Sequence, residues 1–452
     1  MTKTIVVVDK TGRGHSICAA LVSTNPEARV HYVPGTGGVF ENNILPAPDV
    51  TDADSIIAFC EEKRPDFVLV SHIDALIVGV ADRLRAAGFA VFGASKEATQ
   101  LESSKWFCKE ICFERGIVTP AAVIVKERAE LVMILADPSR RPFMVKADWL
   151  TLNGNGAISV REDDLAEDVL REVNLVLEQN PGAPFTFLVE DFLEGNDYSS
   201  HFFLNENSVV PLPSSQDFKN SHEEDRGVNC DGMGSLSPHP FENPLLNDRI
   251  RDSILEPMLE GLHARGVVYN GPIYLGLRLD ANGVPHLLEI NTRMGDSESQ
   301  TIFPRVNEDL SLLIKRLAQG EAVNRPLSVR DETCMTITLA SGPKRTLDDP
   351  LISKEQDWPY RNLGAGAIIR HFPKLQARGS TIYWANVEDG EDGNLQTRPG
   401  RVAHITAMGR TQLEAQRRIY ASINSVCFSG KRWRTDIAVD GADGGKQSGN
   451  CK

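Results

Sequence analysis

One stretch in the second half of the chain guides the interpretation of the rest. From residue 287 to residue 298 it reads Leu287-Leu288-Glu289-Ile290-Asn291-Thr292-Arg293-Met294-Gly295-Asp296-Ser297-Glu298. It begins as an apolar strand and then turns polar. Because strand side chains alternate between two faces, we expect Glu289 and Asn291 to share one face. Leu288 and Ile290 then share the other. A carboxylate and an amide oxygen on one face suit Mg²⁺ held between protein and phosphate.

The residues that follow extend this polar surface. Arg293 continues the same row, and its forked guanidinium suits a phosphoryl oxygen or a carboxylate. Gly295, Asp296 and Glu298 come next in a turn, close enough to hold a second, cationic reactant. Taken alone, the same residues also fit an edge strand with a solvated polar face.

Length and composition limit the class of protein. With 452 residues the chain exceeds what one core usually supports, so we expect two to four domains. A formal net charge of -14 argues against nucleic acid as the main partner. Eight cysteines without a CxxC pair are typical of a reduced, intracellular protein. No apolar run reaches signal-peptide or membrane-spanning length, so we predict a cytoplasmic protein without a membrane partner.

The first hundred residues alternate strands with helices, which predicts an α/β domain with a parallel sheet. The expected strands are residues 4–8, 30–33, 67–70 and 89–92. Ligands of such sheets bind beyond the carboxyl ends of the strands. Three candidate loops lie at such ends, namely residues 12–15, 34–38 and 71–74.

The middle of the chain supplies the features of a phosphate site. A helix over 101–116 carries Lys105 near its start, and a strand over 143–148 carries Lys146 near its end. The polar loop 153–156 is the turn of a hairpin able to close over phosphates. Residues 222–234 hold no periodicity and form a long irregular loop, which is usually functional or disordered.

Together these features resemble the ATP-grasp fold. More closely, the chain resembles the glycinamide ribonucleotide synthetase (phosphoribosylamine–glycine ligase) family from the first strand to about Ile437. The matching stretches, in order, are residues 12–15, 34–38, 100–105, 145–148, 211–217, 232–234 and 288–300. The resemblance implies an α/β fold of three domains. They are an N-terminal α/β (pre-ATP-grasp) domain over 1–100, an ATP-grasp domain over 101–325 with a flexible lid over about 120–192, and a small strand-rich C-terminal domain over 326–437. We expect a disordered tail over 438–452.

The resemblance also implies a role for each matching residue. The ATP-binding residues would be Lys105, Lys146, Glu190, Asp191, Phe192, Leu193 and Asp197. The metal ligands, for Mg²⁺ or Mn²⁺, would be Glu289 and Asn291. The catalytic residues would be Arg293, Lys219 and Asp217. The substrate-binding residues would be Gly12, Gly35, Thr36, Gly37, Asp217, Asn229, Asp231, Gly295 and Asp296. The partners would be a small amino acid and an amine, and the protein a monomer or homodimer.

The activity implied by the resemblance is carboxylate activation. The γ-phosphoryl group of ATP passes to the carboxylate of glycine or another amino acid, and an amine attacks the acyl phosphate to leave an amide. Such chemistry needs positioning and charge neutralisation rather than a protein nucleophile. A closing flap would keep water from the acyl phosphate.

The departures from the family gather near the flap and the amine. Trp149 stands where the family's flap has a glycine, and Asn155 where it has a lysine. The family's Gly-Pro-Glu is Ser71-His72-Ile73, its C-terminal histidine is missing near Trp384, and Asp231 replaces a glycine. We therefore expect an amine other than phosphoribosylamine. Two alternatives remain: the authentic phosphoribosylamine–glycine ligase of purine biosynthesis, and a catalytically inactive nucleotide-binding regulator, against which the retained oxygen pair and Arg293 count.

Overall fold

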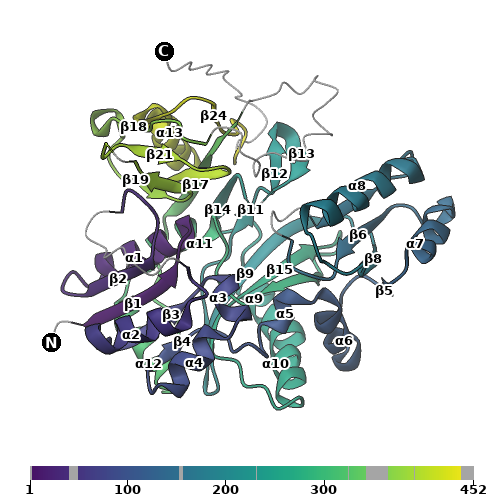
Figure 1. The fold of residues 1–452 in the computed structure, drawn as a ribbon, viewed down its shortest axis with the longest axis horizontal. Helices are drawn as coiled ribbons and strands as arrows, with labels where there is room; N and C mark the ends of the chain where they lie inside the picture. Colours follow the sequence, from purple (N-terminus) through teal and green to yellow (C-terminus); the bar gives the residue numbers. More distant parts are fainter. Residues whose placement is uncertain are drawn as a thin grey trace.

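The structure is a computed structural model that describes residues 3–39, 49–151, 156–230, 232–323, 325–342, 365–390 and 392–438. Figure 1 shows an N-terminal unit, a lid opposite it, a large sheet between them and a strand-rich C-terminal unit above. This arrangement confirms the predicted α/β fold with an ATP-grasp core. Within the described ranges, no helix has the length and hydropathy needed to cross a bilayer.

Buried β-branched strands form the N-terminal sheet. In spatial order they are β2 (Arg29–Pro34), β1 (Thr4–Asp9), β3 (Phe67–Val70) and β4 (Val91–Phe92), all parallel. The covering helices include α1 (Gly12–Thr24), α2 (Ala53–Lys63) and α4 (Val80–Ala86). Because the strands are parallel, the loops after β1, β2 and β3 leave the sheet at one edge, as predicted.

Two antiparallel sheets form the ATP-grasp core. The lid strands, in spatial order, are β5 (Ala122–Val125), β8 (Phe187–Asp191), β6 (Phe143–Ala147) and β7 (Ala157–Val160). Helices α7 (Arg128–Leu135) and α8 (Ala166–Gln179) belong to the lid. The large sheet consists of β10 (Ser208–Pro211), β9 (Asn196–Asn205), β15 (Gly271–Leu279) and β16 (Pro285–Asn291). The turn of the predicted flap, residues 152–155, lies outside the described residues.

A β-bulge changes the predicted alternation in β16. Glu289 pairs with Gly276 and Leu287 with Leu277, so Leu288 has no partner across the ladder. Leu287 is therefore buried beside Ile290 in the core, whereas Leu288 is half-buried. The expectation that Leu288 shares the buried face of Ile290 is wrong, because a bulge inserts one extra residue into the strand.

The helix predicted over 101–116 is divided at Ser104. Short helix α5 (Gln100–Ser103) ends there, and α6 (Lys105–Arg115) begins at the next residue. Ser104 has extended backbone angles, and its hydroxyl caps α6 by accepting a hydrogen bond from Phe107 N. Asp148 accepts hydrogen bonds from the same hydroxyl and from Trp106 N. This cap places Lys105 at the first position of α6.

The predicted irregular stretch contains a small hairpin. Strands β12 (Asn220–His222) and β13 (Arg226–Asn229) pair in antiparallel fashion. The C-terminal segment holds this hairpin, because Arg434 donates to Asp225 Oδ1 at 2.8 Å and to Asn220 O at 3.1 Å. Glu224 N donates in turn to Asp436 Oδ2. Periodicity gave no signal here because each strand is three or four residues long.

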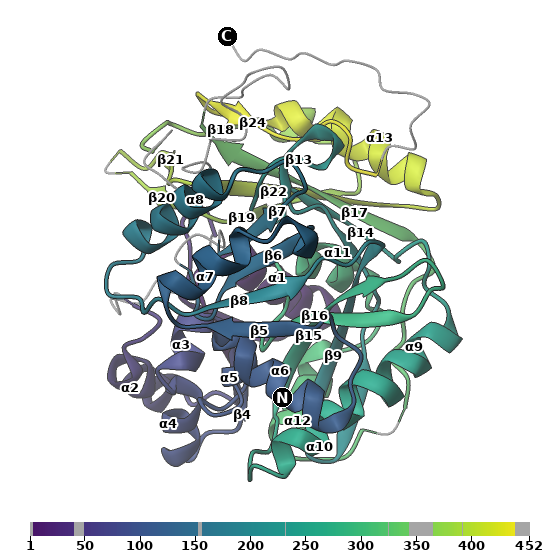
Figure 2. The same cartoon turned by 90° about the vertical axis from the view of Figure 1, so that its right-hand side faces the viewer.

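The C-terminal sheet takes strands from two regions of the chain. Its main path is β11 (Gln216–Asp217), β14 (Gly234–Ser237), β17 (Thr333–Ser341), β22 (Arg401–Gly409) and β19 (Ser380–Trp384). Figure 2 shows this sheet with α13 (Gln412–Ser422) above the lid and the large sheet. Because the sheet runs across the expected boundary at residues 325/326, that division stays a prediction. Beyond Ala438, the expected disordered tail lies outside the described residues.

Candidate active site

One cavity of about 1630 Å³ collects most of the predicted site residues. Its wall comes from the loops of the N-terminal sheet, the lid, the large sheet, the β12–β13 hairpin and residues 385–389. The predicted residues that line it are Gly35, Thr36, Gly37, Lys105, Lys146, Phe192, Asp197, Asp217, Lys219, Asn229, Glu289, Asn291, Arg293, Gly295 and Asp296. Segments distant in sequence therefore meet as expected.

Four predicted residues do not line the cavity, namely Gly12, Glu190, Asp191 and Leu193. Gly12 packs behind the wall, where a Cβ atom would lie 2.6 Å from His404 Cδ2. Asp191 is exposed at the end of β8, and the carbonyl of Leu193 accepts a hydrogen bond from Arg278. Asp231 lies outside the described residues. The roles expected for these residues stay predictions.

Glu190 lies behind the part of the cavity between the lid and the large sheet, and it orients the lysines there. Its carboxylate is 2% exposed and binds Lys146 Nζ at 2.6 Å and Lys109 Nζ at 2.9 Å. The sequence interpretation missed Lys109, although it stands one helical turn after Lys105 on α6. Within the described part of the chain, Lys105 forms no ion pair, and burial lowers its pKa. Lys105 therefore offers a charge to an incoming anion.

Two lid side chains, Arg161 and Phe192, line the outer part of this same space between the lid and the large sheet. The Arg161 guanidinium lies 4.2 Å from the centroid of the Phe192 ring, and both side chains line the cavity. Asp197, across from the lid on β9, uses Oδ1 to bind Arg278 at 2.6 Å. Trp149, the departure in the flap, packs edge-on against Phe187 with ring centroids 5.0 Å apart.

Glu289 and Asn291 line the cavity together, as predicted. Glu289 Oε1 lies 3.1 Å from Lys219 Nζ, and this ammonium lowers the pKa of Glu289 to about 2 against the effect of burial. Asn291 Oδ1 accepts a hydrogen bond from Arg293 at 3.2 Å. In the described ranges, no group of three or more His, Cys, Asp or Glu side chains could hold a metal ion alone. An ionised carboxylate beside an amide oxygen nevertheless fits a Mg²⁺ ion that takes its other ligands from phosphates and water.

A second buried carboxylate, Glu102, fixes Arg293. Glu102 Oε1 accepts from Arg293 Nε at 3.0 Å, and Oε2 accepts from Thr292 N at 2.7 Å. Because Glu102 is 6% exposed, the pair is shielded from solvent and the guanidinium is held against the cavity wall. The sequence interpretation missed Glu102, because it lies in the mostly polar turn Gln100-Leu101-Glu102-Ser103, where a carboxylate gives no local signal.

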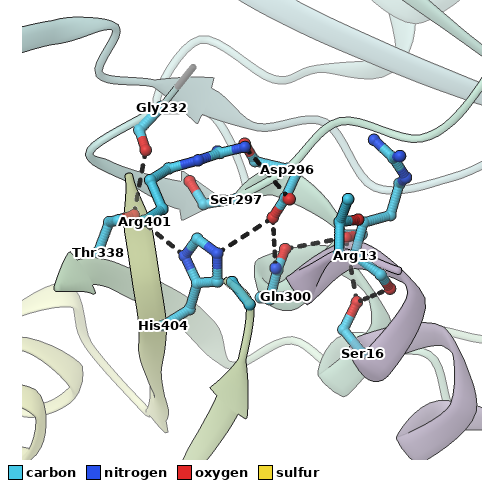
Figure 3. Close-up of polar contacts among 12 residues, drawn as sticks. Arg13, Ser16, Gly232, Asp296, Ser297, Gln300, Thr338, Arg401 and His404 are labelled. Carbon is cyan, nitrogen blue, oxygen red and sulfur yellow. Dashed lines mark hydrogen bonds and ion pairs between the residues drawn. The ribbon is translucent and has the colours of Figure 1, made fainter. Parts of the chain in front are cut away.

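Asp296 is the centre of a buried polar network (Figure 3). Its Oδ1 accepts from Gln300 Nε2 at 2.6 Å and lies 3.2 Å from His404 Nε2. Its Oδ2 lies 3.3 Å from Arg401. Although burial raises its pKa, Arg401 and His404 hold that pKa well below the ordinary value for aspartate. Asp296 thus joins α11 (Glu298–Ile302) to β22, a contact that sequence spacing could not reveal.

The glycine loop after β2 packs against the C-terminal unit. Gly37 N donates to Val387 O at 3.1 Å, and Gly38 N donates to Asp389 Oδ1 at 3.3 Å. The Thr36 hydroxyl donates to Ala385 O. A Cβ on Gly37 would lie 2.9 Å from Glu388 Cα, so the close approach requires glycine. Two N–H groups that could have held an anion therefore have protein acceptors.

The loops after β1 and β3 are joined by Asp9. Its Oδ2 accepts from Ser71 Oγ at 2.7 Å and from Arg13 Nε at 3.1 Å. Arg13 also donates to Met294 O. His72 lines the cavity beside them, and burial lowers its pKa to about 4. Ser71, which departs from the family's Gly-Pro-Glu, therefore has a structural partner.

A lid sheet facing a larger sheet across lysines and an oxygen pair defines an ATP-grasp protein. The chain belongs to the phosphoribosylglycinamide synthetase family. The family's N domain matches residues 3–102, its ATP-grasp (A) domain residues 103–299, and its C domain residues 356–440. Members of this class are ligases, so the chain is an ATP-grasp ligase.

Named relatives cover almost the whole chain. Phosphoribosylamine–glycine ligase of Neisseria meningitidis serogroup A is 30% identical over 435 residues, which are 96% of this chain and 98% of the relative. The protein of the same name from Caulobacter vibrioides is 31% identical over 435 residues, with 96% and 97% covered.

Two solved structures share the overall fold of this chain. The crystal structure of phosphoribosylamine–glycine ligase from Thermotoga maritima is 27% identical, with a TM-score of 0.76 over 96% of this chain and all of that chain. The biotin carboxylase domain of the Hydrogenobacter thermophilus 2-oxoglutarate carboxylase, solved with MgADP, ADP and bicarbonate, has a TM-score of 0.67. It covers 96% of this chain and 92% of that one and, at 14% identity, is similar in fold alone.

Proposed function

We propose that this protein joins an amino acid to an amine through an acyl phosphate, with ATP as the phosphoryl donor. The observation that carries the proposal is one cavity wall that presents Lys105, Lys146, Glu289, Asn291 and Arg293. These groups supply positive charge for phosphates and hard oxygens for a metal, with no protein nucleophile required. Phosphoryl transfer needs this combination of positioning and charge neutralisation.

Each residue has a distinct task in this account. Lys105 and Lys146 neutralise and orient the phosphates, and the ion pair with Glu190 holds Lys146 in position. Bound Mg²⁺ would neutralise charge between phosphates, and Glu289 and Asn291 are the residues that would hold it. Arg293, braced by Glu102, steadies the carboxylate and then the acyl phosphate. The lid excludes water, which would otherwise hydrolyse the acyl phosphate.

The proposal also concerns the identity of the amine substrate. Contacts at the amine end favour a substrate with less negative charge than phosphoribosylamine. Two N–H groups of the glycine loop are occupied by Val387 and Asp389, and Arg13 is committed to Asp9 and Met294. A phosphate monoester placed there would find these donors already bonded to the protein, and an unpaired buried charge is costly. The second candidate is phosphoribosylamine–glycine ligation itself, favoured by the 30% identity over 96% of the chain.

Two glycosylamines that differ by one phosphate separate these candidates. Ribosylamine and phosphoribosylamine are made in place from ribose or ribose 5-phosphate with ammonia, and ammonia alone is the control. With glycine and MgATP, we expect ADP release that requires both the amino acid and an amine, and kcat/KM at least as high for ribosylamine. Product mass identifies the amide, and a panel of amino acids replaces glycine in parallel.

Two results of this experiment would favour the alternatives. A preference of about hundredfold for phosphoribosylamine, near 2.7 kcal/mol, would favour the purine-biosynthetic activity instead. ADP release independent of both amino acid and amine would contradict ligase activity and favour a nucleotide-binding regulator.

A further inference from the structure

Four buried or cavity-lining carboxylates surround the middle of the cavity, and their environments divide them into two pairs. The pKa of Glu289 is lowered by Lys219, and that of Asp296 is held low by Arg401 and His404. Burial raises the pKa of Asp217 and of Glu298. Carboxylates that share a site but are driven apart in pKa usually have different chemical roles. Glu289 and Asp296, the first pair, already contact cationic side chains. Asp217 and Glu298, the second pair, are suited to receiving a proton.

Asp217 is held at the cavity wall by the C-terminal sheet. Among the described residues its Oδ1 is buried and has no hydrogen-bond partner. A Cβ on Gly232 would lie 3.0 Å from this atom, so only glycine leaves room beside it. The groups that act on Asp217 are Glu298 and Asp197, which together with burial raise its pKa, and Lys219 and Arg401, which lower it.

Glu298 comes from a different element, the first turn of α11. Its side chain is 3% exposed and lines the same cavity. A Cβ on Gly295 would lie 2.4 Å from its carboxyl carbon, so the turn before α11 is shaped around this side chain. Lys219 and Arg293 lower the pKa of Glu298, Asp296 raises it, and burial is the largest influence.

The position of this pair matches the step that needs a proton acceptor. Lys219, two residues after Asp217, contacts Glu289 at the metal end. On the other side, Arg401 donates to the backbone oxygen of Asp296 and belongs to the C-terminal wall of the amine half. Lys219 and Arg401 both act on the Asp217 carboxylate, and Lys219 also acts on Glu298, so the pair lies between the phosphate end and the amine end, where an attacking nitrogen would meet an acyl phosphate.

Resting on the proposed function, we infer that the Asp217–Glu298 pair accepts the proton lost by the attacking amine. The nitrogen forms a bond to the acyl carbon, and one N–H proton passes to the ionised carboxylate of the pair. The bond between that carbon and the phosphate oxygen then breaks, and phosphate leaves with the electron pair. The pair returns its proton to solvent after the amide departs.

The test separates amine attack from acyl phosphate formation. Hydroxylamine is uncharged near neutral pH and traps acyl phosphates as hydroxamates without a strong need for a base. In Asp217→Asn, we expect amide formation with glycine and the faster of the two glycosylamines to fall about hundredfold. Hydroxamate formation by the same variant should stay within threefold of the unaltered protein. Asp248→Asn, which removes an exposed charge from α9 (Pro244–Ile250) outside the cavity, is the control and should change neither rate.

The pH profile gives a second measurement that a structural role would not reproduce. Because the acceptor must be ionised, amide formation should rise with pH through the raised pKa of the pair, and hydroxamate formation should not. Glu298→Gln removes one of the two carboxylates that raise the pKa of Asp217, so the acid limb should shift to lower pH. An equal loss of both products in Asp217→Asn, or retention of both, would overturn the inference. Absence of hydroxamate from the unaltered protein would contradict the proposed function, and the inference with it.

Discussion

Single side chains in this cavity are defined by the charges they face. Glu289 remains ionised over the whole physiological range because Lys219 holds its pKa at about 2. Lys219 contacts one carboxylate oxygen of Glu289, so a metal ion would share the carboxylate with it. The charge of Glu289, rather than its shape, is therefore the property on which metal binding depends.

The variant Glu289→Gln tests this dependence at constant shape. We expect activity at ordinary Mg²⁺ to fall at least about hundredfold, because one carboxylate neutralises the ion between two phosphates. The fold should persist, since 38% of the side chain is exposed and a neutral amide can occupy the same space. Activity is followed as a function of Mg²⁺ concentration, with circular dichroism as the control for folding. Near-normal turnover would show that Glu289 is not a metal ligand.

Much of the residue-level site could be predicted from the sequence, because most of these side chains follow strands or glycine loops. Lys105, Lys146, Glu289, Asn291 and Arg293 all line the cavity. The residues that were missed act through others. Lys109 and Glu102 hold predicted residues from behind, and His404 reaches Asp296 from a strand more than a hundred residues away. Local sequence patterns cannot predict such contacts, because the partners come from different elements of the fold.

At the scale of elements, the glycine loop after β2 forms a contact that the sequence does not predict. Gly35, Thr36 and Gly37 line the cavity, where substrate binding stays a prediction, and the loop packs against residues 385–389. The contact includes three loop residues and the backbone of Ala385 and Val387. The loop and the C-terminal segment therefore form one wall of the amine half of the cavity.

Gly37→Ala should disturb this contact. The added methyl group would lie 2.9 Å from Glu388 Cα, and a backbone atom cannot move as easily as a side-chain end. We expect a loss of about 1–3 kcal/mol in the free energy of unfolding, as for other overpacked sites. Urea denaturation measures it. KM for the amine should rise while KM for ATP stays the same, because the phosphate residues belong to other elements. An unchanged free energy of unfolding together with unchanged KM values would contradict the docking role.

The elements that sequence patterns misjudged share a physical cause. Ser104 interrupts a helix because its hydroxyl and Asp148 cap a new one, and Leu288 leaves the alternation because of a bulge opposite Gly276. In both cases another segment takes part: Asp148 bonds Ser104, and Val118 and Thr119 bond the backbone of Leu287 beside the bulge. The buried strands β1 and β3 were predicted correctly because burial alone determines their pattern.

At the scale of the whole molecule, the cavity exists only where several units meet. The nucleotide half lies between the lid and the large sheet, and the amine half between the N-terminal and C-terminal units. Asp296 and its partners link the large-sheet end to the C-terminal sheet, as Figure 3 shows. The family resemblance predicted this assembly, whereas composition alone predicted only a multidomain globular protein.

The central claim is that an acyl phosphate links the two halves of this cavity. Oxygen transfer from the amino acid to phosphate measures it directly. The amino acid that supports ADP release, labelled with ¹⁸O in both carboxylate oxygens, is incubated with MgATP and the preferred glycosylamine, and the released phosphate is analysed by mass spectrometry. We predict one ¹⁸O atom in each phosphate and one in each amide. Phosphate without the label, or formation of AMP and pyrophosphate in place of ADP, would contradict the account.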